Sequence, residues 1–342
     1  MLFTLAISAA VGAVDSPIKA DEVVVFFPTV ATLDPDGKIA TLAVHGWIYE
    51  PEDDSVMRRT ALGLFAKALG FSEDDAKTAH FKKRAGLFLV DNQHGKKVPV
   101  RIGDQTFVLE ESAANGHFRG SVRLPAAGLK PGWLGFQAVT RAGDDRKFEG
   151  RVLVLGETGL SVVSDIDDTI KVSDVRNKKA LLANTFLKDY QAVAGMPELY
   201  NKWAKQGASF HYVSASPWQL YAPLAEFFDK AGYPHGSFHL KSFRLKDSSF
   251  FNLFASPEKT KNQAIEPLLQ AFPKRKFLLI GDSGEKDPEI YAELARKHPQ
   301  QIERILIRDV TGEDAKAERY RKCFEGVARD RWQVFREPKE ID

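Results

Sequence analysis

The chain has 342 residues, a length that corresponds to about two domains, each large enough to bury its own core. Hydrophobic residues make up 44% and charged residues 27% of the sequence, which is typical of a globular protein. The 48 basic and 46 acidic residues leave a net charge of +2, so no strong overall attraction to nucleic acid is expected. A single cysteine, Cys323, excludes an intramolecular disulfide and a cysteine-rich metal centre.

The N-terminal stretch MLFTLAISAAVGAV is apolar, uncharged and rich in small residues. It is too short to span a bilayer, and it resembles the apolar core of a signal peptide, although the basic residues that usually precede such a core are missing. We therefore expect a signal peptide within residues 1–20 and an exported or periplasmic protein. A cytoplasmic location is the alternative.

Residues 21–156 are dominated by short runs in which apolar and polar side chains alternate, separated by turn sequences such as DPDG, AANG and AGDD. Many short strands at regular spacing predict a mainly antiparallel β-sandwich domain. The expected strands cover residues 22–27, 39–49, 86–90, 98–102, 106–110, 117–124, 133–139 and 147–154.

A helical insertion interrupts this β pattern. Asp54 or Ser55 can cap a helix over VMRRTALGLFAKALG, and Ser72 can cap a second helix over EDDAKTAHFKKR. We expect the two helices to lie on one edge of the sandwich.

From Gly159 onward, strand-like runs alternate with longer helical ones, which predicts an α/β domain with a parallel sheet over residues 160–335. The boundary between the two domains is expected at GETG, residues 156–159. The expected strands cover residues 160–164, 209–214, 237–240, 276–280 and 304–307, and the helices cover residues 196–206, 219–231, 260–272, 288–298 and 313–327.

The first strand of this domain ends in carboxylates. The sequence SVVSDIDDT places Asp165 and Asp167 at alternate positions after a β-branched run, with Asp168 and Thr169 directly beyond. Ionised carboxylates are costly to bury unpaired, so we expect a cation beside them. Asp168 is expected to be a surface or supporting residue rather than a ligand.

Two further strands end in polar side chains at the edge where ligands bind in an open parallel sheet. The second strand ends at Ser214, and the fourth ends at Asp282, with Asp287 five residues later. Lys259 and Lys261 lie near the start of the preceding helix. Carboxylates, a hydroxyl and a lysine are the parts of a metal-assisted phosphoryl-transfer site. The alternatives are a structural cation site and simple helix capping by Ser214 and Asp287.

These motifs resemble those of the haloacid-dehalogenase-type phosphatases: D-x-D-x-T, a strand-ending serine, a lysine, and GD followed by a further aspartate. The phrases VVSDIDDTIK, FHYVSASPWQLY, FPKRKFLLIGDSGEKDPEIY and VHGWIYEPE are similar to the actin-patch-associated phosphatidate phosphatase family and its bacterial relatives. The resemblance implies a Rossmann-like phosphatase domain that depends on Mg²⁺ and acts on a phosphate ester, with phosphatidate as the expected substrate.

The resemblance also implies roles for the strand-ending carboxylates. Asp165 would be the nucleophile and would pass through an aspartyl-phosphate. Asp167 would be the general acid and base, with its backbone carbonyl on the metal ion. Thr169 would support the turn.

The same resemblance implies that Ser214 binds a phosphoryl oxygen, and that Asp282 and Asp287 are acidic metal contacts. Lys261 matches the family spacing better as the site lysine, and Lys259 is the alternative.

Two other functions remain open at the sequence level. The substrate could be a soluble phosphomonoester, or the chain could be a non-catalytic module that binds lipid or protein. The apolar run at residues 249–254 (SFFNLF) could contact acyl chains at a membrane surface, or it could pack between loop and sheet. No nucleic-acid partner is expected.

Overall fold

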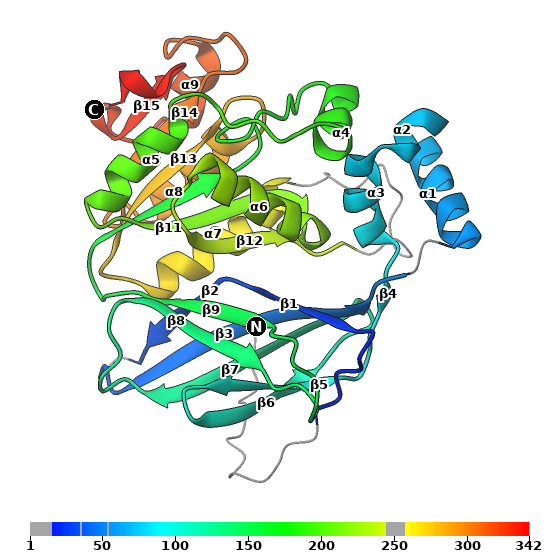
Figure 1. The fold of residues 1–342 in the computed structure, drawn as a ribbon. Coiled ribbons are helices and arrows are strands. Elements are labelled where there is room, and N and C mark those ends of the chain that lie inside the picture. The colour runs from blue at the N-terminus through cyan, green and yellow to red at the C-terminus, as the bar shows by residue number, and fades with distance from the viewer. Residues whose placement is uncertain (1–15, 35, 53–54, 244–256, 342) are drawn as a thin grey trace. The chain divides into compact units, whose positions relative to one another are not determined.

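The computed structural model describes residues 16–34, 36–52, 55–243 and 257–341 (Figure 1). Most of the expected signal peptide and the apolar run at residues 249–254 lie outside the described residues. Contacts divide the chain into two compact units, one formed by residues 1–60 and 89–156 and the other by residues 61–88 and 157–342. Within the described ranges, no helix combines the length and apolarity that crossing a membrane requires.

The first unit is one curled sheet rather than a sandwich of separate sheets. Its nine strands are β1 (Val23–Phe27), β2 (Thr29–Leu33), β3 (Ile39–Glu50), β4 (Asp91–Asn92), β5 (Lys97–Ile102), β6 (Gln105–Glu111), β7 (His117–Pro125), β8 (Gly132–Ala138) and β9 (Glu149–Val154). They follow the order β1-β3-β2-β9-β8-β5-β6, and β4 and β7 also pair with β3. The pairs are antiparallel except β2 with β9, which is parallel.

The expected sandwich is wrong, and the length of β3 explains why the unit forms one continuous sheet instead. Its 12 residues pair with β1, β2, β4 and β7, so hydrogen bonds connect strands that alternation alone would divide between two layers. Every strand of the sheet except β4 contributes a buried apolar side chain to a single core cluster. The strand expected at residues 86–90 is instead a 3-10 turn, Gly86–Phe88.

The expected helical insertion forms as α1 (Val56–Ala68), α2 (Glu73–Lys77) and α3 (Ala79–Ala85). The Ser72 hydroxyl accepts a hydrogen bond from the Asp75 N–H at 3.1 Å, and the Asp75 carboxylate accepts from the Ser72 N–H at 2.9 Å, which is a capping box. At the start of α1, Ser55 accepts from the Arg58 N–H at 3.0 Å, whereas Asp54 lies outside the described residues.

The insertion belongs with the second unit from Ala61 onward, not with the edge of the first. Phe65 and Phe88 place their rings 6.0 and 5.9 Å from the ring of Phe186, which is fully buried. The Arg84 guanidinium donates to the backbone carbonyl of Thr185 at 2.9 Å. Aromatic packing and a buried charge-assisted hydrogen bond therefore hold the insertion in this unit.

The second unit has the expected parallel sheet, in the order β12-β11-β10-β13-β14-β15. Its strands are β10 (Leu160–Asp165), β11 (Ser209–Pro217), β12 (Gly236–Lys241), β13 (Lys276–Asp282), β14 (Ile302–Arg308) and β15 (Trp332–Phe335), and every pairing is parallel. β15 was not expected from the sequence. The helices are α4 (Lys178–Phe186), α5 (Met196–Lys205), α6 (Tyr221–Ala231), α7 (Pro257–Ala271), α8 (Asp287–Lys297) and α9 (Glu318–Cys323).

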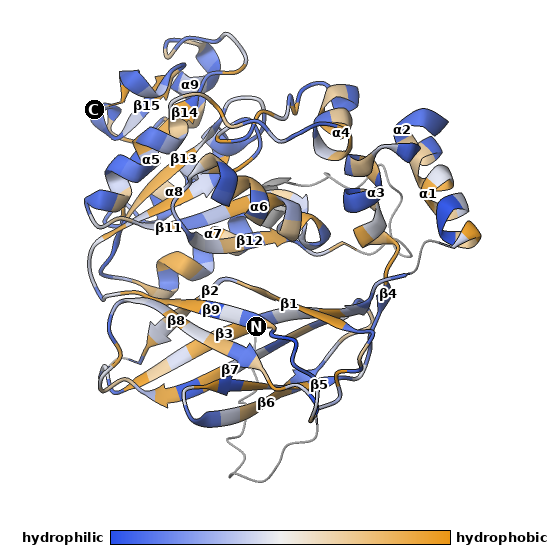
Figure 2. Ribbon diagram, viewed as in Figure 1, coloured by the Kyte–Doolittle hydropathy of each residue, from blue (hydrophilic) through white to orange (hydrophobic). Residues whose placement is uncertain are grey.

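The burial pattern of the central strands fits a parallel sheet with helices on both faces. In β10 every residue after Leu160 is buried, and in β13 every residue after Lys276 is buried. Figure 2 shows the hydrophobic run of β13 in orange. Strands that bury side chains in both directions need cover on both faces, which crossover helices supply. The carboxyl ends of these strands are the remaining places for polar chemistry.

Candidate active site

Three adjacent strands of the parallel sheet end at one place with polar side chains. β10 lies between β11 and β13, so Asp165, Ser214 and Asp282 meet at the same edge. All three residues are buried, as is Asp287 at the first position of α8. The fold thus brings together side chains that are more than 100 residues apart in sequence.

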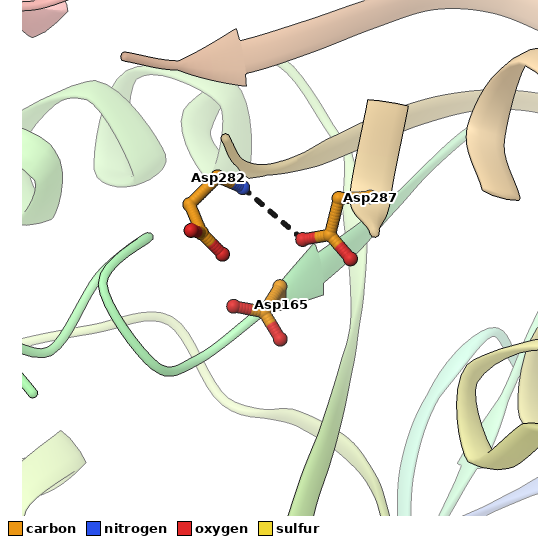
Figure 3. A group of neighbouring side chains, drawn as sticks. All are labelled: Asp165, Asp282 and Asp287. Carbon is orange, nitrogen blue, oxygen red and sulfur yellow. Dashed lines mark hydrogen bonds between the residues drawn. The ribbon is translucent and has the colours of Figure 1, made fainter. Parts of the chain in front are cut away.

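Asp165, Asp282 and Asp287 form a carboxylate cluster. One oxygen from each lies within 4.8 Å of the others. Figure 3 shows the three side chains gathered at one place, with the Asp282 N–H donating to Asp287 Oδ2 at 3.1 Å. Asp282 Oδ1 accepts from the Gly284 N–H at 2.6 Å. Asp282 Oδ2 is buried and has no hydrogen-bond partner within the described part of the chain.

The cluster holds more carboxylates than its one lysine, Lys261, can neutralise. Burial raises the pKa of Asp165 well above its usual value, and the nearby charges of Asp287 and Glu285 add to this even though Lys261 opposes it. Burial and the charge of Asp287 likewise raise the pKa of Asp282. Buried carboxylates with raised pKa values resist ionising together unless a positive charge lies among them.

The cluster has the chemistry of a site for a hard divalent cation. Its donors are all carboxylate oxygens, and the unpartnered Asp282 Oδ2 is an available ligand atom. Two glycines leave room for these carboxylates: a Cβ atom at Gly281 would overlap the Asp287 carboxylate, and one at Gly284 would lie 2.9 Å from Asp282 Oδ1. The residues therefore fit a bound metal ion.

Lys261 lies in the site, on the side of Asp165. Its ammonium group is 2.8 Å from Asp165 Oδ1 and 3.0 Å from Glu285 Oε2, and it also contacts Asp287. The lysine is fully buried, and although burial alone would lower its pKa, the surrounding carboxylates raise it. The side chain of Lys259 lies outside the described part of the structure. Glu285 was not singled out from the sequence, because an acidic residue in a glycine-containing turn usually faces solvent.

Asp167 has its own set of partners, outside the carboxylate cluster. Its Oδ2 accepts hydrogen bonds from Ser214 Oγ at 2.8 Å and Ser216 Oγ at 3.2 Å, and its Oδ1 accepts from Ser173 Oγ at 2.7 Å. Lys171 forms an ion pair with the same Oδ1 at 2.8 Å. Burial acts to raise the pKa of Asp167, but Lys171 and the hydroxyl groups outweigh it and lower that pKa to about 2. The Asp167 carboxylate is thus ionised, and it is not part of the three-carboxylate group.

Thr169 lies beside the expected nucleophile. Its hydroxyl donates to Asp165 Oδ2 at 3.1 Å, while Lys261 contacts Asp165 Oδ1. Both oxygens of Asp165 therefore have a fixed partner, which orients the carboxylate.

Asp168 organises the turn that follows Asp167. It has a positive φ of 57°, in the left-handed region that aspartate tolerates better than most residues. Its carboxylate accepts backbone N–H bonds from Ser173 at 2.8 Å, Asp174 at 2.8 Å and Val175 at 2.6 Å. It is buried, so the expectation of a surface position is corrected in favour of a supporting role.

Lys171 and Ser173 also belong to the site and were missed from the sequence. Both follow the D-x-D-x-T motif at alternate positions, and both side chains are almost fully buried against Asp167. Their alternate spacing beyond the acidic motif was the available signal.

Fold and site define a parallel α/β domain with a buried acidic centre at the carboxyl edge of its sheet. Residues 160–309 match the family model for the catalytic domain of phosphatidate phosphatase APP1. The similarity to this catalytic domain covers that segment of the chain.

Two relatives match with similar strength. An uncharacterized protein of Schizosaccharomyces pombe is 33% identical over 169 residues, which is 48% of this chain and 27% of that protein. Phosphatidate phosphatase APP1 of Saccharomyces cerevisiae is 35% identical over 177 residues, 48% of this chain and 30% of the yeast protein. The chain thus spans less than a third of either relative.

Among solved structures, a β-glucuronidase of Parabacteroides merdae aligns with 83% of this chain and 34% of its own, at a TM-score of 0.27 and 11% identity. A TM-score this low carries no argument about fold or activity.

Proposed function

We propose that this protein is a haloacid-dehalogenase-type phosphatase that uses Mg²⁺ and hydrolyses phosphatidate to diacylglycerol and phosphate. The observation that carries the proposal is the buried cluster of Asp165, Asp282 and Asp287 with Lys261 on its nucleophilic member. The match of residues 160–309 to a phosphatidate phosphatase catalytic domain supports the reaction and the substrate class. A phospholipid substrate would bring the protein to a membrane surface.

Asp165 is the proposed nucleophile. One of its carboxylate oxygens attacks phosphorus, the bond from phosphorus to the ester oxygen breaks, and an aspartyl-phosphate forms. Thr169 and Lys261 hold the two oxygens of Asp165, and the Lys261 ammonium favours the approach of an anionic phosphate. A magnesium ion held by Asp165, Asp282 and Asp287 would neutralise charge between the carboxylate and the phosphate.

Asp167 is the proposed proton carrier. It protonates the leaving alkoxide in the first step and removes a proton from water in the second, when that water attacks phosphorus and releases phosphate from Asp165. The ion pair with Lys171 keeps Asp167 in its ionised form, which is the form needed for the second step. For the first step, Lys171 and Ser214 would turn from Asp167 to the phosphoryl oxygens, which leaves Asp167 free to take up from water the proton that it gives to the alkoxide.

The test is a phosphate-release assay on the purified chain. Phosphatidate in mixed micelles is compared with soluble glycerol, sugar and nucleotide phosphates, in Mg²⁺ and in EDTA. We expect release from phosphatidate in Mg²⁺, loss in EDTA, and recovery when Mg²⁺ is restored. Preference for a soluble ester would contradict the lipid assignment, and activity that survives EDTA would contradict the metal assignment.

A variant pair tests the nucleophile. Asp165→Asn removes the attacking oxygen and should abolish phosphate release, whereas Asp330→Asn, the same change at an exposed site of the second unit, should not. Turnover by Asp165→Asn at the level of Asp330→Asn would exclude Asp165 as the nucleophile.

A further inference from the structure

A cleft separate from the carboxylate cluster lies in the second unit, between the start of α5 and the segment after β15. Figure 1 shows α5, β14 and β15 in the same part of this unit. The cleft has a volume of about 700 Å³, within the usual range for ligand sites. Its apolar lining comes from Val193, Leu199, Pro338 and Ile341, and it shares no residue with the carboxylate cluster.

Basic side chains outnumber acidic ones around this cleft. The charged lining residues are Lys202, Arg308, Arg336 and Lys339 on the basic side, and Glu198 and Glu337 on the acidic side. Three of these charges are already engaged: Lys339 with Glu337, and Arg336 with Asp309 at 3.0 Å. Lys202 is exposed and forms no ion pair in the part of the chain that the structure describes. Glu198 opposes one of the two remaining positive charges, Lys202 and Arg308, so the cleft retains one positive charge for an incoming anion.

Arg308 supplies a guanidinium group in the wall of the cleft. Its Nη1 donates to the backbone carbonyl of Asp168 at 2.6 Å, which fixes the guanidinium in place. Its Nη2 makes no hydrogen bond within the described residues, and an oxyanion is the acceptor that a guanidinium binds best.

The start of α5 forms one side of the cleft. Gly195, the residue before this ten-residue helix, lines the cleft. Gly195 has a φ of 79°, and a Cβ atom there would lie 3.3 Å from Pro338 Cγ. Glycine at this position keeps the cleft open on that side.

We propose that this cleft binds an anionic amphiphile: a phosphate-type oxyanion at Arg308 and Lys202, with its apolar chain along Val193, Leu199 and Pro338. Basic groups alone would suit free phosphate, but the apolar walls would then stay exposed to water. Burying an alkyl chain against them adds favourable transfer free energy. The inference does not depend on the phosphatase activity proposed above.

The test is a calorimetric titration of the full chain in EDTA with two phosphonates, whose carbon–phosphorus bond a phosphatase does not cleave. Decylphosphonate, below the concentration at which it forms micelles, represents the amphiphile, and methylphosphonate represents free phosphate. Lys202→Glu reverses one charge of the cleft. Lys205→Glu is the matched control, because Lys205 is exposed on the same helix and does not line the cleft.

We expect decylphosphonate to bind the wild-type chain and Lys205→Glu equally, and to bind Lys202→Glu at least about tenfold more weakly, as loss of one charge-assisted contact predicts. We expect methylphosphonate to bind the wild-type chain more weakly than decylphosphonate. Equal binding of decylphosphonate by the two variants, or no binding by the wild-type chain, would overturn the site. Equal affinity for the two phosphonates would overturn the role of the apolar walls.

Arg308→Lys provides a second variant that keeps the charge and removes the guanidinium group. We expect it also to weaken decylphosphonate binding, and unchanged affinity would exclude the guanidinium as the anion contact. Phosphate release by the wild-type chain is measured separately. Its absence would contradict the proposed function and leave the result of the titration standing.

Discussion

Replacing Asp282 with asparagine tests whether the carboxylate cluster is built for a cation. Asp282 is fully buried, and its carboxylate lies within 4.8 Å of those of Asp165 and Asp287. Asparagine keeps the shape of the side chain and removes its charge. Without metal, we therefore expect Asp282→Asn to be more stable than the wild-type protein, the opposite of most substitutions at buried positions.

Coulomb's law gives the size of the effect. Two unit charges 4.8 Å apart repel by about 3.5 kcal/mol at an effective dielectric constant of about 20. Asp282 faces two carboxylates, and Lys261 offsets roughly one of them, so about one pair repulsion remains. The raised pKa of Asp282 means that protonation relieves part of this cost. We expect the free energy of unfolding in EDTA to rise by about 1–3 kcal/mol near neutral pH.

The pH dependence has a defined sign. A carboxyl whose pKa is raised by folding contributes its stability below its unfolded pKa, and that contribution is lost as pH rises through the folded pKa. The advantage of Asp282→Asn over the wild type should therefore grow with pH. Denaturant unfolding in EDTA at pH 5 and pH 8 measures it, with the exposed Asp330→Asn as the charge-matched control.

Added Mg²⁺ completes the test. A ligand that binds only the folded state stabilises it more the more tightly it binds, so Mg²⁺ should stabilise the wild type and Asp330→Asn but stabilise Asp282→Asn much less. If Asp282→Asn is less stable than the wild type in EDTA, and Mg²⁺ stabilises all three proteins equally, the cation-site reasoning is refuted.

Three further predictions concern other parts of the second unit. Gly281→Ala should place a methyl group against the Asp287 carboxylate and lower Mg²⁺-dependent phosphate release at least about tenfold while circular dichroism stays unchanged; full activity would contradict this. The pKa of Asp167 is lowered to about 2, so its stabilising contribution is present above about pH 4 and lost as pH falls toward 2. The free energy of unfolding of Asp167→Asn should therefore fall less than that of the wild type between about pH 4 and pH 2. An equal fall for both proteins would contradict this role of Asp167. Phe186→Ala should lower the free energy of unfolding by about 3–5 kcal/mol, with Phe186→Leu much milder in the same denaturant titration.

The parallel unit and its acidic edge were predictable because their signals are local. An apolar β-branched run that stops at a carboxylate, as at Asp165, marks both a buried strand and its functional end. Apolar runs also stop at a polar side chain at Ser214 and Asp282. The carboxyl ends of neighbouring parallel strands meet at one edge of the sheet, which places the three residues together.

What escaped prediction depends on distant pairing. Alternation identifies the face of β3 that is buried, but not that its 12 residues pair with four other strands and join them into one sheet. The sequence of an amphipathic helix shows which face is buried, but not which unit that face packs against. The sequence therefore did not predict that Phe65 and Phe88 would contact Phe186. The signal peptide remains a prediction.

Charged side chains of the site were the hardest to assign. Asp168, Lys171 and Glu285 look like surface residues in sequence, and they are buried or partly buried because each has a partner that only the folded turns bring near. Their role depends on hydrogen bonds to backbone groups and on ion pairs that composition and spacing do not encode.

The hydrogen bonds at Asp168 have a consequence for local opening of the chain. The amide protons of Ser173, Asp174 and Val175 are all held by one carboxylate, and the backbone carbonyl of the same residue accepts from Arg308. Rotation of that single side chain would release all three amides together. We therefore expect residues 173–175 to exchange their amide hydrogens as one cooperative unit.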